Sequence, residues 1–229
     1  MGSLGKILSN VIESSDIYLY YGNIARWWYT IMESIGFALV SIFLAYLFGS
    51  LNAAYYMMKW KHGTDIRTTG SGNAGATNAG RAMGKKGFLL VLLFDLAKGM
   101  LAVLFVRYSG QAELIEGLSV IAAVLGHIFP AQLRFKGGKG IAVSLGALVI
   151  FSYQATFLLL AIFLCIYLFL RRFSISGLLA YGCTAVLLPL LRFDLLTIAV
   201  YVVVTVFILA AHHTHLKAAW SYLLLRNER

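Results

Sequence analysis

The stretch IAVSLGALVIFSYQATFLLLAIFLCIYLFL, Ile141–Leu170, decides how many times this chain crosses a membrane. A spanning helix needs about 20 apolar residues, so this run is longer than one span and shorter than two ordinary ones. Its apolar character is interrupted only at Ser152, Tyr153 and Gln154. The run therefore forms either one long tilted helix or a tight hairpin of two short spans.

The composition of the whole chain is that of a protein built in a membrane. Of 229 residues, 60% are hydrophobic and 12% charged, and the mean hydropathy is +0.82. These values lie outside the range of soluble globular domains. The apolar segments fall near residues 35–58, 87–107, 114–132, 141–153, 154–170, 175–191 and 194–211. We predict an all-α membrane protein of seven transmembrane helices with short glycine-rich loops on the cytoplasmic side.

The placement of cations favours seven spans over six. With seven spans and the N-terminus outside, nearly all basic loops face the cytoplasm, as the positive-inside rule requires. Among the loops between spans, only Arg107 and Arg192 then provide cations that face outward. A six-span chain would divide the basic loops between both sides. The same rule, together with anionic lipid, explains the net charge of +10, so no nucleic-acid partner is expected.

The N-terminal segment has a different character from the rest. It contains a cluster of aromatic residues, typical of an interfacial belt or surface helix: Tyr18, Tyr20, Tyr21, Trp27, Trp28 and Tyr29. No signal-peptide pattern precedes it. We predict an interfacial aromatic extension at 1–34 and a seven-helix membrane domain at 35–229. Cys165 and Cys183 lie in apolar segments without the spacing of a disulfide framework or zinc site.

A polar, glycine-rich stretch, GSGNAGATNAGRAMGKKG, occupies Gly70–Gly87 between two apolar segments. Such backbone is tolerated at membrane depth only where protein buries it or water reaches it. Closely spaced glycines let N–H groups converge on an anion, and an arginine suits phosphate. The alternative is that the small residues mediate close helix packing. The candidate phosphate contacts are Ser71, Asn73, Thr77, Asn78 and Arg81.

A second segment, GHIFPAQLRFKGGKGIAVSLG, places cations and glycines at the start of an apolar helix. The positive end of a helix dipole disfavours a cation and favours an anion. Lys136, Gly137, Gly138 and Lys139 therefore predict a second anion site, although a positive-inside anchor loop would look similar. His127 alone is expected to be structural.

The remaining polar groups form two clusters and one pair. RRFSIS begins at Arg171, and HHTH occupies His212–His215. No metal site is expected, because only two of these histidines share a helix face and no Cys, Asp or Glu accompanies them. Asp95 and Lys98 are three residues apart, so we expect an ion pair. The GxSxG context of a hydrolytic triad is missing.

Together these motifs resemble the bacterial integral membrane acyl-phosphate:glycerol-3-phosphate acyltransferase family. The resemblance rests on GSGNAGATNAGRAMGKKG, FDLAKG, GHIFPAQLRFKGGKGIA and the terminal histidines, and covers roughly Phe43 to Trp220. It implies seven spans, an external N-terminus and a cytoplasmic active site in the cell inner membrane. It also implies transfer of an acyl group from acyl phosphate to the 1-hydroxyl of glycerol 3-phosphate, without any cofactor or obligate protein partner.

The resemblance also implies site residues. Ser71, Arg81, Lys139, Ser174 and His212 match family positions and are the expected catalytic contacts. The substrate-binding residues expected beside them are Asn73, Thr77, Asn78, Lys136, Gly137, Gly138 and His215. His215 stands where the family has asparagine, and Thr214 where it has an acidic residue.

Two other functions remain open from the sequence. An organic-phosphate transporter would share a cationic cavity, but its clusters should face both sides and its halves should repeat in inverted order. A catalytically silent relative would agree with the departure at His215.

Overall fold

The computed structural model describes residues 14–213, and within this range every regular element is helical. The elements in chain order are α2 (Ser14–Ser50), α3 (Ala53–His62), η1 (Ile66–Thr68), α4 (Ala76–Tyr108), α5 (Glu113–Ile128), η2 (Ala131–Leu133), α6 (Ile141–Phe151), α7 (Tyr153–Leu170), α8 (Phe173–Leu190) and α9 (Leu195–Ala211). Backbone contacts divide the chain into two compact units between Val40 and Ser41.

The first unit contains the N-terminal part of α2. Its large apolar side chains are exposed, including Trp27 (61%), Trp28 (52%) and Leu39 (64%). Exposed apolar residues along a helix are suited to contact with lipid. The roles predicted for residues 1–34 stay predictions, and residues 1–13 lie outside the described part.

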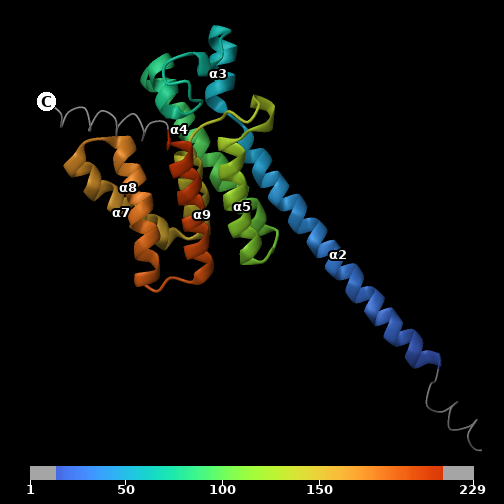
Figure 1. The fold of residues 1–229 in the computed structure, drawn as a ribbon. Coiled ribbons are helices and arrows are strands. Elements are labelled where there is room, and N and C mark those ends of the chain that lie inside the picture. The colour runs from blue at the N-terminus through green and yellow to red at the C-terminus, as the bar shows by residue number, and fades with distance from the viewer. Residues whose placement is uncertain (1–13, 214–229) are drawn as a thin grey trace, which may run out of the picture. The chain divides into compact units, whose positions relative to one another are not determined.

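The second unit contains the helices from Ser41 onward (Figure 1). Five helical segments of the described chain are long and apolar enough to cross a membrane, at Arg26–Ser50, Ala76–Tyr108, Glu113–Leu133, Tyr153–Leu170 and Phe173–Leu190. Two further apolar helices, Ile141–Phe151 and Leu195–Ala211, are shorter. The protein is therefore a multi-pass membrane protein. The 11 residues of α6 rise only about 16 Å, roughly half the hydrocarbon thickness.

The long apolar run is broken where its polar residues predicted an interruption. Ser152 has an extended backbone (φ −145°, ψ 92°) and separates α6 from α7. The amide of Ser152 donates to Leu148 O at 2.8 Å, which closes α6, and its carbonyl accepts from Thr156 N at 3.1 Å, which opens α7. The run therefore forms two helices here and not one long helix.

The first predicted span differs from the observed helix at both ends. The prediction was residues 35–58, whereas α2 runs over Ser14–Ser50. Its end is set by Asn52, whose extended backbone and side-chain oxygen, accepting from Tyr55 N at 2.9 Å, start the separate helix α3. An Asn cap of this kind satisfies an amide that the helix itself leaves unpaired. The helix α4 also begins earlier than predicted and bends at Gly84, where φ is 73°.

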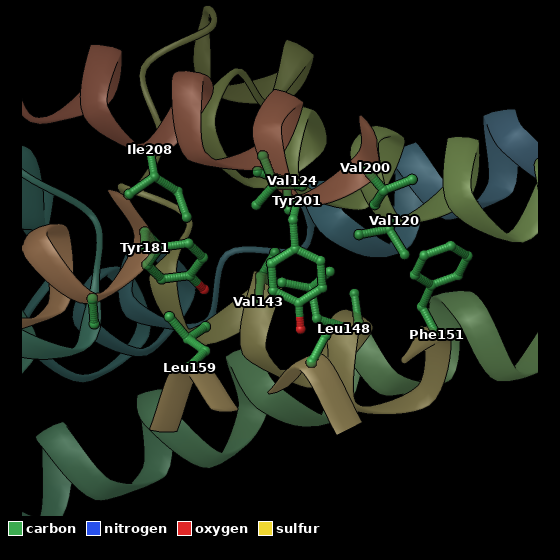
Figure 2. Close-up of a cluster of buried hydrophobic side chains, with 14 of the residues drawn as sticks. Val120, Val124, Val143, Leu148, Phe151, Leu159, Tyr181, Val200, Tyr201 and Ile208 are labelled. Carbon is green, nitrogen blue, oxygen red and sulfur yellow. The ribbon is translucent and has the colours of Figure 1, made fainter. Parts of the chain in front are cut away.

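A buried core lies among α4–α9 (Figure 2). Its largest members are Tyr181 and Tyr201, which are almost fully buried. The Tyr181 hydroxyl lies 2.6 Å from Ser144 Oγ, and the Tyr201 hydroxyl lies 2.7 Å from Thr156 Oγ1. These hydrogen bonds join α6 to α8 and α7 to α9. Each contributes about 1 kcal/mol in a membrane and satisfies groups that lipid could not.

Glycines bring two pairs of helices into backbone contact. A Cβ on Gly99 of α4 would overlap the carbonyl of Val143, and one on Gly146 of α6 would overlap the carbonyl of Leu96. Gly49 of α2 and Gly126 of α5 form the same reciprocal arrangement. Without a hydrophobic driving force between helices in lipid, such close contact supplies much of the attraction. The α4–α6 contact holds the two glycine-rich loops side by side.

Candidate active site

The first glycine-rich loop folds around one buried asparagine. Asn78 is 1% exposed. Its amide nitrogen donates to Ile66 O at 3.1 Å and to Thr69 O at 3.0 Å, and its oxygen accepts from Ser71 N at 3.0 Å. Gly70 and Gly72 turn the chain with φ of 56° and 70°. The loop amides of Ser71 and Gly72 are thus used within the loop and do not form the predicted anion nest.

The start of α4 provides an anion-binding feature in its place. Gly75 precedes the helix with extended backbone and no side-chain cap. The first-turn amides of an uncapped helix are free to bind an anion, and the helix dipole favours negative charge there. Gly75, Ala76 and Thr77 line a cavity at this point. Arg81, one turn further along α4, lines the same cavity.

The second glycine-rich loop is tied to the end of α5. Gly137 N donates to Ile128 O at 3.0 Å, and Gly138 N donates to His127 O at 2.9 Å. Gly137 O in turn accepts from Ala74 N at 3.4 Å, which joins the two loops. A Cβ on either glycine would overlap His127 or Pro130. Glycine is needed here so that the loop can lie against α5.

This arrangement places Lys139 in the lining of the same cavity as the start of α4. Burial, and then the charge of Arg81, lower the pKa of Lys139 to about 8. Within residues 14–213 neither cation has an acidic partner. Two neighbouring cations of this kind are a favourable setting for an anionic ligand, since the ligand relieves their repulsion.

The cavity has a volume of about 360 Å³ and collects residues from four distant parts of the chain. The predicted residues that line it are Ser71, Asn73, Thr77, Arg81, Lys139, Ser174 and His212. They lie at the ends of α4, α6, α8 and α9 that meet at one end of the bundle (Figure 1). The lining also includes apolar side chains: Phe88, Leu92, Ile141, Leu145 and Leu178. The cavity can therefore take a molecule with a charged end and a hydrocarbon end.

Four predicted binding residues lie away from this cavity. Asn78 is used inside its loop, and Gly137 and Gly138 make room for α5, as described above. Lys136 lines a separate cavity of about 450 Å³ with Asp65, Arg67, Gly72 and Arg134. His215 lies outside the described residues.

The lining of the second cavity contains an ion pair. Arg67 lies 2.7 Å from Asp65 and also donates to Leu133 O at 2.6 Å and Lys136 O at 3.2 Å. The hydrogen bonds from Arg67 lower the pKa of Asp65. Because Arg67 is fully engaged, its role is to join the two loops.

Three buried ionisable side chains next to the main cavity were not predicted as a site. The ion pair of Asp95 and Lys98 is confirmed, with Lys98 Nζ 2.8 Å from Asp95 Oδ1. His127 joins them, since its Nδ1 lies 2.9 Å from Lys98 Nζ. Asp95 and His127 both line the cavity. The spacing of Asp95 and Lys98 predicted that they form an ion pair. Nothing in the sequence predicts that α5, which carries His127, packs beside them.

Comparison with known proteins gives a consistent result. A family model described as glycerol-3-phosphate acyltransferase matches residues 39–221. Glycerol-3-phosphate acyltransferase 1 of Bacillus anthracis is 36% identical over 169 residues, 74% of this chain and 89% of the relative. The glycerol-3-phosphate acyltransferase of Pseudomonas putida is 41% identical over 178 residues, 76% of this chain and 91% of the relative.

A solved structure is also similar. The crystal structure of PlsY (YgiH), an integral membrane glycerol 3-phosphate acyltransferase, in its glycerol 3-phosphate form, aligns with a TM-score of 0.74 and 31% identity. The alignment covers 80% of this chain and 92% of that one. The lysophosphatidic acid form of the same protein aligns with a TM-score of 0.71.

Proposed function

The chain belongs to the glycerol-3-phosphate acyltransferase family, and from this we propose that it transfers a fatty acyl group from acyl phosphate to the 1-hydroxyl of glycerol 3-phosphate. The products are lysophosphatidate, an early intermediate of phospholipid biosynthesis, and inorganic phosphate. The observation that carries the proposal is a single cavity that is lined both by the cations Arg81 and Lys139 and by several apolar side chains. Both substrates are phosphates, and one of them carries an acyl chain.

In the proposed reaction the 1-hydroxyl oxygen attacks the carbonyl carbon of acyl phosphate. A carbon–oxygen bond to the glycerol forms, the bond to the leaving phosphate breaks, and the hydroxyl proton is accepted by a substrate phosphate. No protein base is required, because acyl phosphate already has a good leaving group. Holding both reactants in one cavity supplies much of the rate enhancement through positioning.

The proposed roles of the side chains follow from their charge. Arg81 and Lys139 neutralise phosphate oxygens, and the amides at the start of α4 add hydrogen bonds to the same group. Ser71, Ser174 and His212 supply further hydrogen-bonding groups around the reacting centre. The apolar residues of α4, α6 and α8 hold the acyl chain.

We also propose that the chain crosses the membrane seven times, with its N-terminus outside and the cavity on the cytoplasmic side. The distribution of cations supports this orientation. The helix break at Ser152 supports counting α6 and α7 separately.

The proposal is tested with the purified protein in detergent or proteoliposomes. Palmitoyl phosphate and glycerol 3-phosphate together should release inorganic phosphate and form lysophosphatidate, and neither substrate alone should do so. Palmitoyl coenzyme A in place of palmitoyl phosphate should give no product. Folded protein that forms lysophosphatidate only from the thioester would contradict the proposed donor.

Replacing Arg81 by alanine should lower kcat by about 100-fold or more, because a charge that stabilises the transition state is lost from a partly dehydrated site. Lys86→Ala is the matched control, since Lys86 is an exposed cation on the same helix and does not line the cavity. Activity should be measured as phosphate release at saturating substrates. Equal activity of the two variants would remove Arg81 from the proposed mechanism.

A further inference from the structure

The buried cluster of Asp95, Lys98 and His127 is costly to maintain at membrane depth. All three residues are at most 3% exposed, and removing charged groups from water costs several kcal/mol for each ion, which the attraction within the pair must offset. Membrane proteins retain such groups mainly where they serve a function. Two of the three line the cavity, so their function concerns the molecule bound there.

The hydrogen bonds of the cluster assign the tautomer of His127. An ammonium group carries only donors, and Lys98 directs one of them to Leu51 O at 2.5 Å and another to His127 Nδ1 at 2.9 Å. Asp95, 2.8 Å from Lys98 Nζ, supplies the counter-charge. His127 Nδ1 therefore accepts, and the ring proton of a neutral imidazole must reside on Nε2.

The Nε2 edge of the ring faces the catalytic loop. A Cβ on Gly138 would overlap His127 Nε2, which shows that this atom lies directly against the loop carrying Lys139. Within residues 14–213 no protein group accepts a hydrogen bond from Nε2. Nε2 is not one of the fully enclosed polar atoms that lack a partner, and His127 lines the cavity. An atom of a substrate bound in the cavity can therefore accept a hydrogen bond from it.

The charges around His127 limit which substrate atom can accept the hydrogen bond from Nε2. Asp95 Oδ1 lies 3.7 Å and Lys98 Nζ 2.9 Å from His127 Nδ1, and because their charges oppose each other the pair gives a phosphate dianion no net attraction beside the ring. Arg81 and Lys139 attract phosphate elsewhere in the same cavity. A neutral N–H donor that its neighbours hold in place suits an oxygen that gains charge only during the reaction.

We propose that His127 donates its Nε2 hydrogen to the carbonyl oxygen of the acyl group and stabilises the oxyanion of the tetrahedral transition state. Lys98 and Asp95 are positioning residues: Lys98 fixes the tautomer and Asp95 fixes Lys98. This inference rests on the proposed acyl-transfer reaction and names a donor that the sequence motifs do not provide.

Two amide substitutions separate this role from a structural one. The amide nitrogen of glutamine can reach the position of Nε2, whereas the asparagine amide reaches only that of Nδ1. His127→Gln should keep kcat within about tenfold of the wild type, and His127→Asn should lower kcat by about 100- to 1,000-fold with little change in KM. Thermal unfolding of both variants in detergent provides the folding control. A variant His127→Asn at least as active as His127→Gln, or a loss confined to KM, would overturn the proposal.

A measurement on the wild-type protein does not depend on whether the variants fold. With histidine labelled with 15N in the ring, His127 should show a proton bonded to Nε2 and an unprotonated Nδ1. Its resonance can be identified with single glutamine variants of the other four of the 5 histidines. Adding an acyl phosphonate, an analogue that cannot be cleaved, should shift the Nε2 signal.

A proton on Nδ1, or an Nε2 signal that the analogue leaves unchanged, would refute the role of His127. Wild-type protein that released no phosphate would instead refute the proposed function, so the two failures can be told apart.

Discussion

Asn73, in the loop before α4, and Asn78, in the first turn of α4, carry the same amide but have different surroundings. Asn73 lines the cavity, whereas Asn78 is buried and makes three hydrogen bonds inside the loop. A sequence motif treats the two alike, because both are polar residues five positions apart in a glycine-rich run. Only the folded loop shows that one faces the ligand and the other supports the backbone.

The two asparagines should respond differently to alanine. Asn78→Ala leaves buried backbone groups without partners, at about 1–3 kcal/mol for each, so both the midpoint of thermal unfolding and the activity should fall. Asn73→Ala should leave the unfolding midpoint unchanged and lower kcat/KM by about 10- to 100-fold, the value of a hydrogen bond to a charged group. Unfolding in detergent and phosphate release on the same samples give both quantities. The reverse pattern would contradict the assignment.

Lys139 makes the reaction sensitive to pH in a defined direction. Its pKa of about 8 means that the free protein holds the cation below pH 8 and loses it as pH rises. If the cation binds phosphate, kcat/KM should decline above about pH 8 in buffers of constant ionic strength. Arginine stays charged throughout this range, so the remaining activity of Lys139→Arg should show no decline there. A decline of equal size in both proteins would mean that another group titrates.

At the scale of the helices, the length and polarity of the segments predicted most of the fold. The observed helices from α5 to α9 follow the predicted apolar segments closely, and the polar residues at Ser152 mark the break between α6 and α7. The early end of the first span and the bend at Gly84 were not predicted. Both depend on backbone conformation, at Asn52 and Gly84, that hydropathy does not report.

The glycine contact between α4 and α6 should tolerate no side chain. Gly99→Ala forces a methyl group into the backbone of α6 near Val143, and overpacking of this kind costs about 1–3 kcal/mol. We expect a lower unfolding midpoint and lower activity, because this contact holds the two loops together. Gly182→Ala is the control, since a Cβ there meets no atom within 4 Å. Similar midpoints for the two variants would show that the close approach of α4 and α6 contributes little.

For the whole molecule, the seven-span arrangement makes opposite predictions for two exposed arginines. Cys165 and Cys183 are first replaced by serine. Arg171→Cys should then react with an impermeant maleimide from the cytoplasmic side and Arg192→Cys from the outer side. Lys86→Cys and Tyr108→Cys mark the two sides. A six-span chain would exchange the results at Arg171 and Arg192.

The site as a whole was partly predictable. Segments far apart in sequence were predicted to meet at one membrane face because their charges agree in sign, and the cavity contains Arg81, Lys139, Ser174 and His212 together. The contribution of His127 could not be predicted, because it arises from the distance between α4 and α5. Side-chain packing decides which helices are neighbours in a bundle, and the hydropathy and charge of the segments do not report this packing.

The half-polar, half-apolar lining of the cavity has a consequence for how the proposed reaction depends on its surroundings. Glycerol 3-phosphate arrives from water, where its supply is a concentration per volume. Acyl phosphate arrives from the leaflet, where its supply is a mole fraction per area. The rate law then combines a concentration in a volume with a concentration in a surface. Growth of the membrane therefore dilutes acyl phosphate and leaves the concentration of glycerol 3-phosphate unchanged. When glycerol 3-phosphate is saturating, such a catalyst responds to the ratio of acyl donor to existing lipid surface.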